Sequence, residues 1–452
     1  AAEVPPKKPA KKGGDLDDGE EVLQAIVIAD SFKRRMSPVT YTGPKSLLPV
    51  ANIPTLSYTL ELLGAAGVKE VFVVCSSHSD KISEFVDNLG SSVPFTVIVV
   101  DVPSCRSMGA AMREIDSRGK IRGDFFLIHG DVISTISLQE VLEGHKTRRE
   151  KEKNKDAIMT MVFKPTPPKH RRPMYAEDDL AVAVNPESQQ LIHFQSMRGQ
   201  SFNVDPARFE PHPSVQIRYD LEYTEMCVCS PEVLCLFTDE FDWLDFYRDF
   251  VPGVLTSEIL SYQIYTHVAT TGYSGSIKCL NSYNAVNRDV VHRWTYPLVP
   301  EVNLLANTSY SYAHKGVYKE RGVTLAQSCK IGNDSVFGQG TVVNEGAYVS
   351  CSILGRKCTI GKGVTIIGSI LMSGVTVGDG AVIRNAIVCN NAVLGERVKV
   401  SQNCVIADGV KIAAGVELAE KTRVTVAFPT DVGGDDDDDF SSDEERADET
   451  NE

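Results

Sequence analysis

An apolar residue recurs at every fifth or sixth position in the second half of the chain, and this period restricts the fold more than any other feature. The series starts at Leu325, Ile331, Phe337, Val343 and Val349, which are each six residues apart. It continues at Leu354, Ile360, Ile366, Leu371, Val377, Ile383, Val388, Leu394, Val400, Ile406, Ile412 and Leu418. Three steps complete one coil of about 17 residues, which predicts a left-handed parallel β-helix of hexapeptide repeats. A β-sandwich would instead show a period of two.

A β-helix of this kind buries its apolar stack but leaves unpaired backbone groups in its first and last coils. Another surface must cap or pair with these coils. We therefore expect the β-helix to take part in oligomerisation, and a self-contained scaffold is the alternative.

The first half of the chain alternates short β-rich runs with amphipathic helical ones. Strands are predicted at 25–30, 70–76, 95–102, 124–131 and 157–163, and helices at 56–65, 78–88 and 109–117. This alternation is typical of parallel strands joined by crossover helices, a doubly wound, Rossmann-like α/β domain. The predicted organisation is a disordered basic leader (1–20), the α/β domain (21–318), the β-helix (319–428) and a disordered acidic tail (429–452).

The net charge of −14 is concentrated at the C-terminal end. Residues 431–452 contain twelve acidic residues and one arginine, a net charge of −11, so the other 430 residues carry only −3. The basic stretch 145–156 mixes both signs and has no aromatic residue, which argues against a nucleic-acid partner. No apolar run approaches the roughly 20 residues of a membrane helix. The eleven cysteines include no Cys-x-x-Cys pair, so we expect reduced, mostly buried thiols of an intracellular protein and no metal.

Two motifs follow the first predicted strand. The runs ADSFKRRMSPVT (29–40) and PKSLLPVANIP (44–54) resemble the signature of sugar-phosphate nucleotidyltransferases, in which a glycine-rich loop approaches a nucleoside triphosphate. The run His-Gly-Asp that ends at Asp131 resembles the family's Gly-Asp, whose aspartate holds Mg²⁺. The order of an α/β domain followed by a β-helix also agrees with this family.

The glycine-rich loop, however, departs from the family pattern. Asp30, Ser31 and Lys33 replace its three glycines, so side chains fill space that a phosphate-binding backbone needs. At about 4 Å, Asp30 would repel a phosphate charge by on the order of 4 kcal/mol. Arg35, Lys45 and Asp131 are kept. These residues predict a vestigial pocket with no cofactor; weak nucleotide binding and an active sugar-phosphate nucleotidyltransferase are the alternatives.

The altered loop and several long segments resemble the epsilon-subunit family of translation initiation factor 2B. The matching segments are 58–82, 227–243 and 284–301, and the resemblance extends over roughly residues 22–445. It implies a subunit of the cytoplasmic guanine-nucleotide exchange factor that promotes GDP release from initiation factor 2. It also implies a hetero-oligomer with two copies of each of five subunits, in which this chain pairs with the gamma subunit.

In that family an Asn-Phe pair contributes to nucleotide exchange. Glu240 and Phe241 stand at the matching place, so the aromatic ring is kept while a carboxylate replaces the amide. Glutamate accepts hydrogen bonds but cannot donate them as asparagine does. The role therefore carries over more readily to Phe241. The alternative is that 241–250 is only an amphipathic segment packed against the domain.

Family members continue into a C-terminal helical domain of HEAT type that carries most of the exchange activity. This sequence stops at Glu452 within the acidic run, and we interpret it as the assembly core without that domain. In the tail, Ser441 and Ser442 each precede an acidic residue by three positions, which predicts phosphorylation by an acid-directed kinase.

Overall fold

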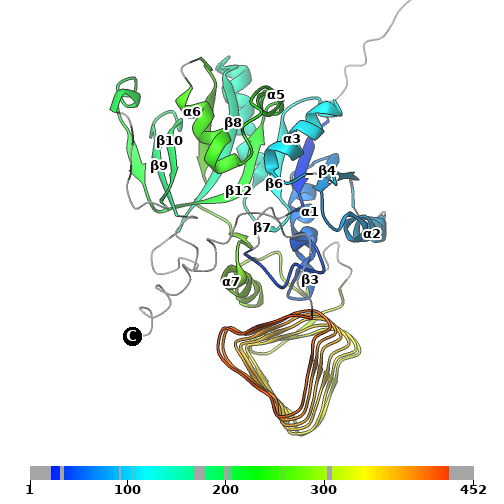
Figure 1. Cartoon of the computed structure of the whole chain (residues 1–452). Coiled ribbons are helices and arrows are strands. Elements are labelled where there is room, and N and C mark those ends of the chain that lie inside the picture. The colour runs from blue at the N-terminus through cyan, green and yellow to red at the C-terminus, as the bar shows by residue number, and fades with distance from the viewer. Residues whose placement is uncertain are drawn as a thin grey trace, which may run out of the picture.

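The fold is described from a computed structural model of the chain. The structure describes residues 22–30, 35–90, 93–103, 105–166, 179–197, 202, 204, 206–257, 259–302 and 308–426. The basic leader, most of the altered loop, the acidic tail and its two serines lie outside these residues. Figure 1 shows an α/β domain above a β-helix that is viewed along its axis as a triangle.

The α/β domain is built on one seven-stranded sheet with the order β13-β8-β12-β6-β1-β4-β5. Its strands are β1 (Gln24–Ile28), β4 (Glu70–Cys75), β5 (Thr96–Asp101), β6 (Phe125–His129), β8 (Ala157–Pro165), β12 (Leu221–Cys229) and β13 (Gln263–Val268). The five strands predicted from the sequence are all present. The sheet is nevertheless mixed, because β12 runs antiparallel to both β6 and β8. The five predicted strands run in the same direction, as expected, and β12 is an additional strand outside the predicted set.

Helices cover both faces of this sheet, as expected for a doubly wound domain. They are α1 (Thr55–Ala65), α2 (Ser79–Leu89), α3 (Met108–Ser117), α4 (Leu138–Lys146), α5 (Glu232–Asp239) and α6 (Val251–Thr256). Alternate residues of β1 point to opposite faces. Ala25 and Val27 join the core formed with α1, α2 and α4, whereas Ile26 and Ile28 join the core formed with α3, α5 and α6. Smaller sheets add β9 (Leu180–Val184), β10 (Leu191–Ser196) and β11 (Gln216–Arg218), and the pair β7 (Val132–Ser134) and β14 (Ser274–Ser276).

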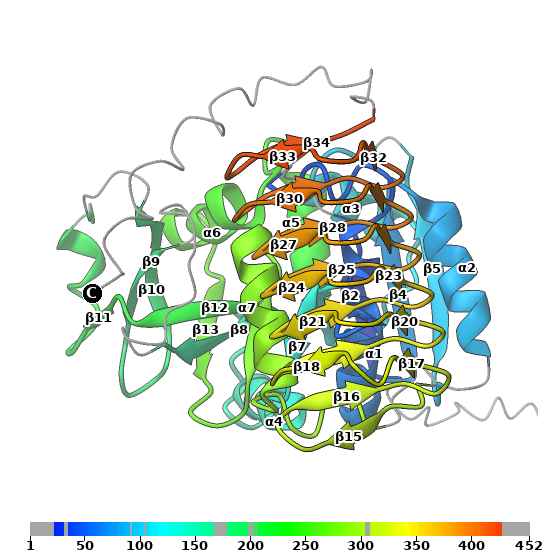
Figure 2. The same cartoon turned by 90° about the horizontal axis from the view of Figure 1, so that it is seen from below.

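The second half of the chain forms the predicted β-helix, whose coils are stacked in Figure 2. Its first face has β15 (Ser311–Ala313), β16 (Val317–Lys319), β19 (Ser335–Phe337), β22 (Ile353–Leu354), β25 (Ile370–Leu371), β28 (Ile387–Val388), β31 (Val405–Ile406) and β34 (Arg423–Val424). The second has β17 (Thr324–Leu325), β20 (Val342–Val343), β23 (Thr359–Ile360), β26 (Thr376–Val377), β29 (Val393–Leu394) and β32 (Lys411–Ile412). The third has β18 (Lys330–Ile331), β21 (Tyr348–Ser350), β24 (Thr365–Ile367), β27 (Val382–Arg384), β30 (Lys399–Val400) and β33 (Glu417–Leu418).

The register of these strands confirms the repeat. Val349, Ile366, Ile383 and Val400 are directly paired from coil to coil and buried. The stacked coils also explain why glycine recurs after the apolar positions. A Cβ atom on Gly338 would lie 2.6 Å from the carbonyl carbon of the glycine one coil further on, which no side chain tolerates.

A third apolar core joins the two domains. It combines residues of the segment 36–58 and of α7 (Leu280–Val291) with the first face of the β-helix. Figure 1 shows α7 and β3 (Ile53–Pro54), which pairs with β2 (Pro49–Val50), lying between the sheet and the β-helix. Hydrogen bonds add to the apolar contacts: Asn52 Nδ2 donates to the Leu354 carbonyl at 2.8 Å, and Tyr318 Oη donates to the Val291 carbonyl at 3.2 Å.

All eleven cysteines are free thiols, and eight of them are buried. Within the described residues, no helix is long and apolar enough to cross a membrane. The free and mostly buried cysteines agree with the expectation that their thiols serve as small core residues.

Candidate functional site

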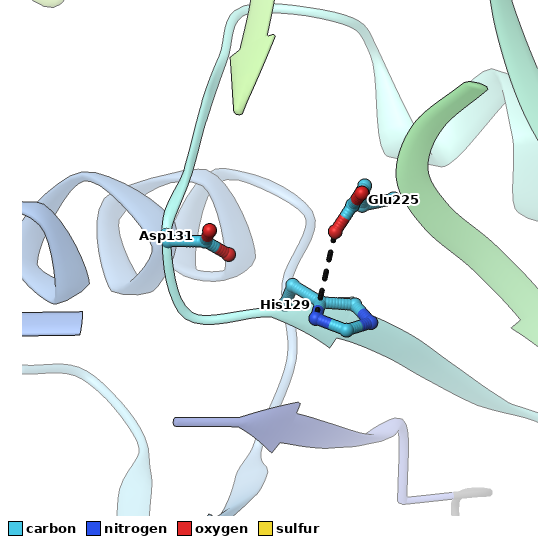
Figure 3. A group of neighbouring side chains, drawn as sticks. All are labelled: His129, Asp131 and Glu225. Carbon is cyan, nitrogen blue, oxygen red and sulfur yellow. Dashed lines mark ion pairs between the residues drawn. The ribbon is translucent and has the colours of Figure 1, made fainter. Parts of the chain in front are cut away.

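Three side chains that could bind a metal meet where β6 ends. His129 is the last residue of β6, Asp131 follows it, and Glu225 comes from the neighbouring strand β12 (Figure 3). One ligand atom of each lies within 4.8 Å of the others. Gly130, between His129 and Asp131, packs closely against its neighbours, because a Cβ there would be 3.2 Å from Ser46 Cβ and 3.3 Å from the Ile28 carbonyl oxygen. Topology thus gathers residues that are almost a hundred positions apart in sequence.

Glu225 occupies an unusual backbone position. Its φ angle is +61°, and the pairing of β12 with β8 shifts register between Tyr223 and Cys227. A glutamate in the left-handed region is uncommon, and such strained residues gather at sites that the surrounding structure holds firmly. The bulge turns this carboxylate into the cluster.

Two lysines approach the carboxylates of this cluster. Lys45 Nζ lies 2.5 Å from an oxygen of Asp131, and Lys278 Nζ lies 3.3 Å from an oxygen of Glu225. The other oxygen of Glu225 lies 3.5 Å from His129 Nδ1. Asp131 and Glu225 are both buried. The cluster therefore contains two ion pairs whose formal charges cancel.

The charges around Glu225 control its ionisation. Burial alone would raise its pKa, but the positive charges of Lys278, His129 and Lys45 together outweigh burial and lower the pKa to about 2. Glu225 is thus a carboxylate at neutral pH, and it is stabilised by neighbouring side chains.

The arrangement does not fit the Mg²⁺ that the family resemblance implies. Magnesium ions require several oxygen ligands, usually carboxylates and waters, in near-octahedral geometry. Here an ammonium group already lies against each carboxylate, and a divalent cation would meet two fixed positive charges within a few ångströms. Chemically, the cluster is a closed network of ion pairs.

Asp30 of the altered loop lies at the end of β1 and is bound to the loop after β4. Its carboxylate accepts hydrogen bonds from Ser77 Oγ at 2.8 Å and from the Ser77 amide at 3.3 Å, and also from the Ser76 amide. Arg35 is buried, whereas Ser31 and Lys33 lie outside the described residues. The carboxylate of Asp30 is thus bound by the loop after β4.

Phe241 and Glu240 lie elsewhere, just after α5. The Phe241 side chain is 72% exposed, and the Arg113 guanidinium of α3 lies 5.1 Å from the centre of its ring. Glu240 is exposed next to it. The following residues Phe246 and Phe250 are buried. The segment therefore both packs against the domain and presents one aromatic ring to solvent.

The sequence reasoning missed Glu225 and Lys278. Glu225 stands directly before the apolar end of the strand LEYTEMCVC, but Glu222 lies in the same strand, so the sequence does not single Glu225 out. Lys278 stands in the loop before α7 and is not singled out either. Lys45 and Asp131 were predicted to belong to one pocket, and the structure places them in contact.

Two family models match the chain, one in each half. The model of a nucleotidyl transferase matches residues 24–171, and the model of the left-handed β-helix domain of the eIF2B epsilon subunit matches residues 314–418. They agree with the two domains seen in the structure.

Individual relatives extend this agreement. The eIF2B epsilon subunit of Dictyostelium discoideum is 40% identical over 74% of this chain and 47% of its own length. The epsilon subunit of Schizosaccharomyces pombe is 41% identical over 75% of this chain and 50% of its own length. The eIF2B gamma subunit of Dictyostelium discoideum is 22% identical over 52% of this chain and 58% of its own length. The chain spans about half the length of the two epsilon subunits. Over the part that it shares with them, it belongs to the family of eIF2B epsilon subunits.

Proposed function

We propose that this chain is a subunit of the exchange factor that promotes GDP release from initiation factor 2. The observation that carries the proposal is the identity of about 40% to two epsilon subunits over three quarters of the chain. The match of the β-helix to the epsilon model supports it, because a sugar nucleotidyltransferase is not expected to match that model.

Exchange of this kind needs no covalent chemistry from the chain. A factor that binds the nucleotide-free form of a GTPase more tightly than the nucleotide-bound form promotes release of GDP. The chain needs an exposed contact surface for this task. Phe241, with its ring in solvent above Arg113, is the residue that we propose for it, and Glu240 lies at the rim of the same surface.

We further propose that the α/β domain has lost nucleotidyl transfer. The match of residues 24–171 to nucleotidyl transferases records the shared fold. Against catalysis stand the replacement of the three loop glycines and the negative charge of Asp30 at the loop. An active nucleotidyltransferase remains the second candidate, since it is favoured by the same match.

The proposed partners are the GTPase initiation factor 2 and the sibling subunits, in a cytoplasmic hetero-oligomer with two copies of each subunit. The similarity to a gamma subunit over half of the chain supports an assembly of subunits with related folds. Neither nucleic acid nor a membrane is proposed as a partner.

The test is reconstitution with sibling subunits, followed by measurement of GDP release from initiation factor 2. We expect the chain to copurify with the gamma subunit and release to be faster with the chain than without it. Extending the chain with the remaining sequence of its longer relatives measures how much exchange resides outside residues 1–452. In parallel, sugar 1-phosphates and nucleoside triphosphates with Mg²⁺ should yield no pyrophosphate. Pyrophosphate release that Asp131→Ala abolishes would establish the second candidate instead.

A further inference from the structure

We infer that Lys45 and Lys278 take the place of a divalent cation between Asp131 and Glu225, and that their two ion pairs fasten the β-helix to the α/β domain. The inference does not depend on the exchange activity proposed above. It starts from the origin of the four charged residues, which come from two different layers of the molecule.

Both carboxylates come from the central sheet or the turn that follows it. Asp131 lies two residues after the end of β6, and Glu225 lies within the adjacent strand β12. Each is less than a tenth exposed, so neither can recover full hydration if its partner is removed. Two buried negative charges thus lie close together near the carboxyl end of β6.

Both lysines belong to the layer that carries the β-helix. Lys45 begins the short helix η1 (Lys45–Leu47), and the residues that follow, Val50 and Ile53, enter the core shared with the β-helix. Lys278 stands two residues before α7, whose Val286 and Val290 enter the same core. Each lysine therefore connects the sheet to one of the two segments on which the β-helix rests.

Lysine side chains can do what a cation would do here, with one difference. A divalent ion between two carboxylates neutralises them, but its occupancy depends on its concentration. The two ammonium groups neutralise the same carboxylates and are part of the chain. The two lysines lie in different segments, residues 45–54 and the loop before α7. Breaking both ion pairs should therefore make local opening of these segments more frequent.

The first test is cation binding, with Mn²⁺ as the probe and electron paramagnetic resonance of free Mn²⁺ as the readout. We compare the unmodified chain, the double variant Lys45→Met/Lys278→Met, and the control Lys362→Met, which removes an exposed lysine paired with Glu345 on the β-helix. We expect one Mn²⁺ site in the double variant, lost when Asp131→Asn is added, and no such site in the other two chains. A site in the unmodified chain that Asp131→Asn removes, or a folded double variant without a site, would overturn the substitution of a cation.

The second test is amide hydrogen exchange of α7 and of residues 45–54. We expect these amides to exchange roughly tenfold faster or more in the double variant than in the control, because broken buried pairs favour local opening. Lys278→Arg keeps the charge and should restore part of the protection lost in Lys278→Met. Unchanged exchange in the double variant, or equal exchange in Lys278→Arg and Lys278→Met, would overturn the role in fastening the domains.

Discussion

The two regions singled out by the sequence differ in how they use their side chains. The cluster at the end of β6 is charged, buried and paired with itself through Lys45 and Lys278. The end of α5 is apolar and open, with Phe241 72% exposed. A region whose groups are already satisfied has little left to offer a ligand, whereas an exposed ring gains free energy when a partner covers it. The contrast supports our proposal that this chain acts through a surface and keeps the old pocket as structure.

The largest effect on stability should come from truncating the buried ring of Phe246, and we compare it with truncation of the exposed ring of Phe241. Phe246→Ala removes a buried ring that stacks on Phe250, with centroids 5.6 Å apart, and should cost about 4 kcal/mol of unfolding free energy. Phe241→Ala should cost less than about 1 kcal/mol, because its ring already faces water. Urea unfolding followed by circular dichroism measures both. Equal costs would show that Phe241 is a core residue.

Removing one partner of a buried pair should have the next largest effect. Lys278→Met leaves the Glu225 carboxylate without its lysine and should lower the free energy of unfolding by about 3 kcal/mol. Lys399→Met, which breaks an exposed pair with Glu417 on the β-helix, should change it by less than about 1 kcal/mol. Urea titrations measure the unfolding free energy of both variants. Similar losses would mean that the buried pair of Lys278 and Glu225 stabilises the chain no more than an exposed pair does.

The acid dependence of stability sharpens the same point. The pKa of Glu225 is lowered from 4.5 to about 2 in the folded chain, so its contribution is present above pH 4.5 and is lost as the pH falls toward 2. This contribution should be on the order of 3 kcal/mol. The difference in unfolding free energy between the unmodified chain and Glu225→Gln should therefore shrink between pH 5 and pH 2. A difference that stays constant over this range would refute the paired carboxylate.

The smallest effect should come from the tail. Phosphate on Ser441 or Ser442 should leave the unfolding free energy unchanged to within about 0.5 kcal/mol, because the acidic, aperiodic sequence around them predicts a disordered tail. We expect mass spectrometry of the chain from cells to find phosphate on at least one of these serines, and Ser441→Ala/Ser442→Ala to remove it. Unmodified serines would refute the predicted modification.

The β-helix could be predicted from the sequence because its core obeys a local rule. Each apolar residue from Leu325 to Leu418 marks one face of one coil, and neighbouring coils are consecutive in sequence. The α/β domain follows no such rule. Alternating strands and helices predicted its layers, but the antiparallel direction of β12 depends on contacts between distant strands.

The candidate site shows the same limit. Lys45 and Asp131 were predicted together because both lie in motifs that resemble one family. Glu225 and Lys278 are 53 positions apart, in no motif, and meet only because β12 and the loop before α7 converge. Likewise, the sequence FDWLDFYRDF does not tell which phenylalanine is exposed. The strand β12, the bulge at Glu225 and the packing of α5 determine these details through tertiary contacts.

The claim that this chain acts through its exposed surface is tested most directly by GDP release from initiation factor 2 in the assembled factor. The two chains to compare carry Phe241→Ala and Tyr219→Ala, the second of which removes another half-exposed aromatic ring of the same domain. A lost contact of about 2 kcal/mol should slow release roughly 30-fold with Phe241→Ala. Tyr219→Ala should release GDP at the unmodified rate. Unchanged release with Phe241→Ala, or an equal loss with both, would contradict the account.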